Sequence, residues 1–174
     1  MKHILVATDG SETANRAVDL AAEMAARFGV PMTVGNVLQF DRSVDELGRM
    51  AEVEHLVENV RRAAPPNFGL MSGSMGDLLG DTRPRDERVR VITMLGDEVL
   101  RRAADAAREK GAKTVQTRSA QGDPADSILD MAAEVDADLI VLGHRGLGRL
   151  KTLLLGSVAL KVMQHAECSV LSVR

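Results

Sequence analysis

The residues with the clearest chemical potential lie between Gly143 and Ser157, in the stretch GHRGLGRLKTLLLGS. Two residues separate Gly143 from Gly146, and nine more lead to Gly156 and Ser157. An apolar run precedes this stretch and a helical pattern follows it. Glycines allow main-chain N–H groups to approach an anion closely, and a helix N-terminus adds donors and a positive dipole. The spacing therefore indicates a phosphate-binding loop, and with it a nucleotide site.

Other well-known phosphate and catalytic motifs are absent from the sequence. It contains no G-x-x-x-x-G-K-[ST] loop, no G-x-S-x-G elbow and no CxxC or HExxH pair. The pair Gly146 and Gly148 lacks the third glycine of a dinucleotide fingerprint at the required spacing. A purely structural interpretation of the glycines remains open, in which they serve a tight crossover and close packing.

The composition excludes several classes of protein. A chain of 174 residues, 45% of them hydrophobic, is expected to form one globular domain. A net charge of −3 and an aromatic content of 2% argue against a nucleic-acid partner. The sequence has no apolar stretch long enough to span a bilayer and no signal-like start, so we expect a cytoplasmic protein without a membrane partner. The single cysteine, Cys168, is expected to be a buried, inert thiol.

Short apolar runs alternate with helical patterns along the chain. Strands are expected at residues 3–7, 32–38, 113–118, 138–142 and 169–173, and helices at 14–28, 44–64, 95–110, 125–135 and 158–165. Residues 65–84 are rich in Gly, Ser and Pro and show neither period, which predicts a flexible insertion or loop. The alternation predicts an α/β sandwich of three layers around a parallel sheet.

Local signals place the ends and faces of several helices. Gly29 should end the first helix, Asp123 should cap the helix that begins near Pro124, and Ser157 should cap the last one. Apolar residues at helical spacing in the first helix, expected to face the core, are Ala17, Leu20, Ala21, Met24 and Phe28.

Two polar loops follow strands of the predicted sheet. TDGS begins at Thr8, and GHRG begins at Gly143. Because both lie at the carboxyl ends of parallel strands, we expect them to face the same side of the sheet, where such folds bind ligands. The Asp9 carboxylate is an acceptor suited to ribose hydroxyls or to a water bound to Mg²⁺. The alternative role of Asp9 is to cap the helix that follows.

Residues 3–25 and 122–174 resemble the universal stress protein family. Its ATP-binding members carry G-x2-G-x9-G-[ST], which is complete here, whereas residues 41–94 lack clear family character. The resemblance implies a single universal stress protein domain over residues 1–174. It also implies a Rossmann-like fold of the adenine nucleotide alpha hydrolase type, with a five-stranded parallel sheet of order 3-2-1-4-5.

The resemblance further implies a bound adenine nucleotide: ATP, or AMP or ADP, with Mg²⁺ near Asp9. Residues implied to close over adenine and ribose are Ala7, Thr8, Asp9, Val37, Leu142 and Gly143. Residues implied to hold the phosphates are Gly143, Gly146, Gly156, Ser157, Val158 and Ala159. Beside them, His144 and Arg145 offer a possible phosphate contact and positive charge. No residue is assigned a catalytic role.

Three functions remain open from the sequence. The first is an ATP-binding stress or signalling protein that acts as a nucleotide-dependent switch, since no general base or paired acids are evident. The second is a slow ATPase or autokinase that uses Asp9 and Ser157. The third is a nucleotide-independent, chaperone-like scaffold that uses residues 65–84. The resemblance also implies a homodimer through the last strand, whose apolar SVLSVR edge is suited to pairing.

Overall fold

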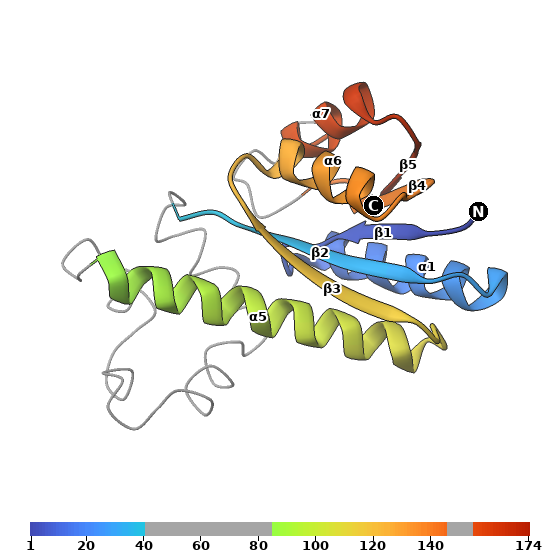
Figure 1. Ribbon diagram of the computed structural model, residues 1–174, viewed down its shortest axis with the longest axis horizontal. Helices are drawn as coiled ribbons and strands as arrows, with labels where there is room; N and C mark the ends of the chain where they lie inside the picture. Colours follow the sequence, from blue (N-terminus) through green and yellow to red (C-terminus); the bar gives the residue numbers. More distant parts are fainter. Residues whose placement is uncertain (41–84, 146–154) are drawn as a thin grey trace.

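The computed structural model describes residues 1–40, 85–145 and 155–174, in which helices and strands alternate (Figure 1). The elements are β1 (Ile4–Ala7), α1 (Glu12–Phe28), β2 (Met32–Leu38), α5 (Arg85–Glu109), β3 (Val115–Gln121), α6 (Pro124–Glu134), β4 (Leu139–Gly143), α7 (Ser157–His165) and β5 (Ser169–Val173). The expected helix at 44–64, the expected loop at 65–84 and Gly146 lie outside these described residues.

The strands form one five-stranded parallel sheet in the order β3-β2-β1-β4-β5. Helices α1 and α5 cover one face of the sheet, and α6 and α7 cover the other (Figure 1). The α/β class, the three layers and the strand order predicted from the sequence are therefore confirmed.

Strand β1 lies at the centre of the core. Ile4, Leu5 and Val6 are all 0% exposed. Ile4 and Val6 pack among residues of α1 and α5, while Leu5 packs among residues of α6 and α7. Consecutive side chains of a strand point to opposite faces, so a strand covered on both sides reads as a continuous apolar run.

The buried face of α1 differs from the predicted one. Leu20 is 37% and Phe28 61% exposed, so their predicted place in the core is wrong. The buried positions are mostly alanines, namely Ala14, Ala17, Val18, Ala21, Ala22 and Ala25. Small side chains let a helix axis come close to a sheet, and this close packing is what decides the orientation of α1. Gly29, with φ of 65°, ends the helix as predicted.

Two further predictions about helices need correction. Helix α5 begins at Arg85 and not at the predicted residue 95. The prediction missed the first part of the helix because the charged segment RDERVR conceals the periodicity of its apolar residues. Ser157 does not cap α7: Gly156 occupies the N-cap position and Ser157 is the first helical residue. Asp123, by contrast, caps α6 as predicted, because its carboxylate accepts from the amides of Ala125 and Asp126.

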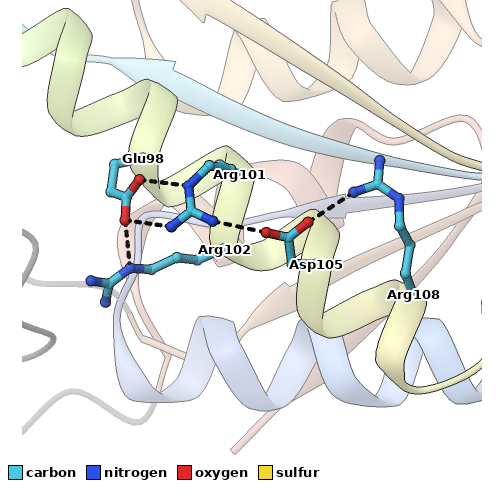
Figure 2. A network of polar contacts seen from close by, with 5 residues as sticks. All are labelled: Glu98, Arg101, Arg102, Asp105 and Arg108. Carbon is cyan, nitrogen blue, oxygen red and sulfur yellow. Dashed lines mark hydrogen bonds and ion pairs between the residues drawn. The ribbon is translucent and has the colours of Figure 1, made fainter. Parts of the chain in front are cut away.

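The outer face of α5 carries a chain of ion pairs (Figure 2). Arg101 donates to Glu98 at 2.8 Å and to Asp105 at 2.9 Å. Arg102 also donates to Glu98, and Arg108 donates to Asp105. Charges three or four residues apart share one side of a helix. The charges of these arginines are therefore balanced by carboxylates of the same helix, and the ion pairs cover one side of α5.

Candidate functional site

The carboxyl ends of β1 and β4 lie side by side in the middle of the sheet. Ala7, the last residue of β1, is paired with Leu142, and Gly143 ends β4. The loops that follow, Thr8 to Ser11 and His144 to Arg145, therefore leave the sheet at the same place. This is the juxtaposition that the sequence predicts for a ligand site.

The loop after β1 is a tight turn held by its own polar groups. The Gly10 amide donates to Thr8 Oγ1 at 3.2 Å, and the Ser11 amide donates to Asp9 Oδ1 at 3.0 Å. Gly10 has φ of 79°, a conformation that glycine adopts without strain. Ser11, not Asp9, is the N-cap of α1, because the Ala14 amide donates to Ser11 Oγ. Asp9 therefore shapes the turn that precedes the helix.

Asn36 on β2 contacts this loop, and sequence analysis did not single it out. Its Nδ2 donates to the Thr8 carbonyl at 2.7 Å, and the residue is 4% exposed. Val37, the predicted adenine neighbour, follows directly; it is part-buried, pairs with Ala120 and packs on the side of α6 and α7. The signal that points to Asn36 is a polar residue inside the otherwise apolar end of the strand, GNVL.

The end of β4 is packed against the first turn of α1. A Cβ on Gly143 would lie 2.8 Å from both the Ala14 amide nitrogen and Thr13 Oγ1, so no side chain fits there. The Thr13 hydroxyl donates to the Arg145 carbonyl and joins the first turn of α1 to the loop after β4. Gly143 is thus required for close packing, in agreement with the structural interpretation of this glycine. Thr13 is a second residue that sequence analysis missed.

Helix α7 begins next to the same loop. The Gly156 amide donates to the His144 carbonyl at 2.9 Å, which brings the two ends of the glycine-rich stretch together. No side chain caps the N-terminus of α7. Ser157 is exposed there, Val158 is half-buried and Ala159 is buried. The first turn of α7 therefore begins beside His144, and a helix N-terminus there presents backbone donors and a positive dipole.

The pKa of His144 is affected by positive charge at this end of β4. Burial is the main cause that lowers the pKa of His144, and the nearby charges of Arg174 and Arg145 lower it further. A neutral imidazole beside two guanidinium groups favours an anionic ligand more than a cationic one.

The structure offers no cluster of metal ligands within the residues it describes. No group of three or more His, Cys, Asp and Glu side chains is close enough there to hold an ion. The contact of Asp9 with Mg²⁺ through water stays a prediction. Across the same described ranges, no helix has the length and apolarity needed to cross a membrane.

A comparison with known families decides the classification. The model of the universal stress protein family matches residues 1–174. The chain belongs to the universal stress protein family. Universal stress protein YxiE of Bacillus subtilis (strain 168) is 33% identical to it, over 98% of this chain and 97% of that protein.

Solved structures of universal stress proteins share the fold. One, a universal stress protein in complex with cAMP, is 26% identical with a TM-score of 0.59, and the match covers 99% of this chain and 97% of that one. Another, from Archaeoglobus fulgidus in complex with dAMP, is 25% identical with a TM-score of 0.60 and covers 100% and 98%. These similarities extend over the whole universal stress protein domain.

The opposite end of the sheet in this universal stress protein holds an open, polar hollow. Its lining includes Lys2, Asp136, Asp138, Glu167, Cys168 and Ser169. Cys168, predicted to be buried, is only part-buried and lines this hollow; burial raises the pKa of its thiol, which favours the less reactive protonated form. None of the predicted nucleotide residues lines this hollow, so the two ends of the sheet are chemically distinct.

Proposed function

We propose that this universal stress protein binds an adenine nucleotide at the carboxyl ends of β1 and β4 and acts as a nucleotide-dependent switch in a stress response. Relatives of 26% and 25% identity were solved with cAMP and dAMP, and both share the fold over nearly the whole chain. The observation that carries the proposal is the contact between the first turn of α1 and the loop after β4, made by the Thr13 hydroxyl and the Arg145 carbonyl.

The proposed contacts place adenine and ribose at the ends of β1, β2 and β4, and the phosphates at the start of α7. Ala7, Thr8, Asp9 and the backbone of Val37 close over adenine and ribose, while Leu142 and Gly143 border the ribose. The phosphates lie against Gly146, Gly156, Ser157, Val158 and Ala159, next to His144 and Arg145. Two features support this placement: the first turn of α7 has no side-chain cap, and positive charge surrounds His144. In an ATP complex, Asp9 holds Mg²⁺ through water.

We also propose that two copies pair through β5. Three of its residues are apolar and only part-buried: Val170, Leu171 and Val173. The opposite edge strand, β3, exposes Gln116, Thr117, Arg118 and Ser119, a polar set that discourages pairing. Self-association through β5 covers apolar surface and leaves β3 in solvent.

Nucleotide binding is tested on protein purified without added ligand. Mass spectrometry of the small molecules released on denaturation should identify an adenine nucleotide. Calorimetry of the stripped protein should then show binding of ATP, AMP or cAMP, with Mg²⁺ present and absent. Protein that releases no nucleotide and binds none of the three contradicts the proposal.

A pair of serine variants tests the position of the site. Ser157→Ala removes a hydroxyl proposed to meet a phosphate oxygen and should weaken ATP binding several-fold, by about 1 kcal/mol. Ser169→Ala is the matched control, because Ser169 is also exposed but lies at the amino end of the sheet. Equal ATP affinities of the two variants would place the phosphates elsewhere.

A further inference from the structure

Asn36 is a polar side chain in the buried part of β2. The residue is 4% exposed, and its neighbours along the strand are Gly35 and Val37. A buried amide costs free energy unless it is hydrogen-bonded, so an asparagine at this position requires a partner.

The partner is the loop after β1. Asn36 Nδ2 donates to the Thr8 carbonyl at 2.7 Å, and the Thr8 amide donates to the Gly35 carbonyl at 2.9 Å. A carbonyl oxygen only accepts, so the amide nitrogen of Asn36 must be the atom that faces it. Two consecutive residues of β2 thus hold both backbone polar groups of Thr8.

Helix α5 leaves the space that Asn36 needs. A Cβ on Gly96 would lie 3.1 Å from Asn36 Oδ1 and 2.3 Å from Leu38 Cδ2. Glycine inside a helix costs about 1 kcal/mol relative to alanine. The close approach of α5 to the end of β2 provides the reason for a glycine at this point of the helix.

We infer that Asn36 is a positioning residue for the nucleotide: it fixes the Thr8 carbonyl and thereby the orientation of the turn from Thr8 to Gly10. This inference rests on the proposed function. Without the hydrogen bond from Asn36, the peptide between Thr8 and Asp9 loses the restraint on its carbonyl, and Asp9, which follows it, is less firmly oriented. The turn would then meet the ribose in several orientations, and each binding event would have to select one of them.

Affinity is tested with Asn36→Ala and a matched control, Thr33→Ala. Thr33 lies on the same strand, is 0% exposed and exchanges a hydrogen bond with His3 Nε2, but at the amino end. The probes are ATP, AMP and cAMP. Asn36→Ala should weaken binding of the best probe roughly tenfold, whereas Thr33→Ala should stay within about twofold of the wild type. Equal losses in the two variants overturn the inference.

Asn36→Asp separates positioning from loss of packing, because it preserves the shape of the side chain. As a carboxylate it only accepts and leaves the Thr8 carbonyl without a donor; as a protonated carboxyl it donates again. Because burial raises the pKa of a carboxyl at this position, the affinity of Asn36→Asp relative to the wild type at the same pH should recover as the pH is lowered from 9 to 5, whereas that of Asn36→Ala should stay constant. Binding equal to the wild type at pH 9 overturns the inference.

Amide hydrogen exchange without nucleotide provides a readout that does not depend on the proposed function. The amides of Gly10 and Ser11 should exchange faster in Asn36→Ala than in Thr33→Ala. If the wild type binds none of the probes, the proposed function fails while this measurement still decides whether Asn36 holds the turn. Unchanged exchange of both amides contradicts that role.

Discussion

The two ends of the parallel sheet are held together by different kinds of interaction. At the carboxyl end, neutral groups hold each loop to a neighbouring element: Asn36 on β2 donates to the Thr8 carbonyl, and the Thr13 hydroxyl on α1 donates to the Arg145 carbonyl. At the amino end, the Asp138 carboxylate accepts from the Lys2 amide at 2.7 Å and lies 3.6 Å from the amino group of Met1. The amino end should therefore respond to pH more than the carboxyl end does.

The largest effect is expected from Gly143→Ala. The added Cβ would meet the backbone of α1 at 2.8 Å, so β4 or α1 must shift, which we expect to cost about 1–3 kcal/mol of unfolding free energy and to weaken nucleotide binding. Urea denaturation measures the first effect and calorimetry the second.

Gly29→Ala provides the control for that substitution. It places a Cβ in open space at a φ of 65° and should cost about 1 kcal/mol through backbone strain alone, with no effect on binding. A Gly143→Ala variant as stable as the wild type would show that the ends of β4 and α1 are not closely packed.

A smaller loss is expected from Thr13→Val, which removes the donor to the Arg145 carbonyl. Unfolding free energy should fall by about 1 kcal/mol, and nucleotide affinity should fall as well, because the loop after β4 is no longer bonded to α1. Thr93→Val is the matched control: Thr93 Oγ1 also donates to a backbone carbonyl, that of Val89, but on α5. Similar nucleotide affinities of Thr13→Val and Thr93→Val would show that the hydrogen bond from Thr13 to Arg145 does not contribute to nucleotide binding.

The amino end should show a smaller effect that depends on pH. Burial opposes the charged form of Asp138, but the amides of Lys2 and His3 and the amino group of Met1 together lower the pKa of this carboxyl. A lowered pKa in the folded state means that the stabilisation is present above the unfolded value of about 3.8 and is lost as the pH falls through the folded value.

Asp138→Asn is the variant that tests this dependence. It should be less stable than the wild type at pH 7, and the difference should shrink below pH 4, as measured by thermal unfolding across that range. Nucleotide affinity should not change. A stability difference that is independent of pH would contradict the assigned role of the carboxylate.

The smallest expected effect is spectroscopic. Burial, Arg174 and Arg145 lower the pKa of His144, and a phosphate placed beside it would counter the positive charges and raise that pKa. AMP binding should accordingly shift the NMR titration of the His144 ring to higher pH, and affinity should increase as the pH falls through that titration. The ring signal of His165, at the far end of α7, is the internal control. An unshifted His144 titration places the phosphate away from β4.

The positions of β1, β2 and β4 were predictable from the sequence because apolar runs covered on both faces end sharply in polar loops, whereas the exposed edge strand β3 spans Val115–Gln121 and not the predicted 113–118. The bounds of β2 and β5 match their predictions, and so does the meeting of the loops after β1 and β4. The orientation of α1 was not predictable, since spacing alone does not tell an alanine stripe from one that includes Leu20 and Phe28. The start of α5 was concealed by the charged segment RDERVR, in which few residues are apolar.

Contacts between residues far apart in the chain were the part of the site that the sequence did not reveal. Thr13 and Arg145 meet only because β1 and β4 are adjacent, and Asn36 reaches Thr8 only because β2 lies on the other side of β1. Neither Thr13 nor Asn36 belongs to a sequence motif that would have indicated its contact. The predicted nucleotide contacts themselves stay predictions, with Gly146 outside the described residues.

The position of β1 in the sheet determines the order in which its two neighbouring strands become available during synthesis. On one side it pairs with β2, which follows after a single helix; on the other it pairs with β4, which is made much later. Local pairings form fast, whereas distant ones carry the entropy of closing a long loop. A nascent chain that ends before Leu139 lacks one wall of the site, however well its first half has folded. Nucleotide binding at the proposed site would therefore distinguish complete chains from partly synthesised ones.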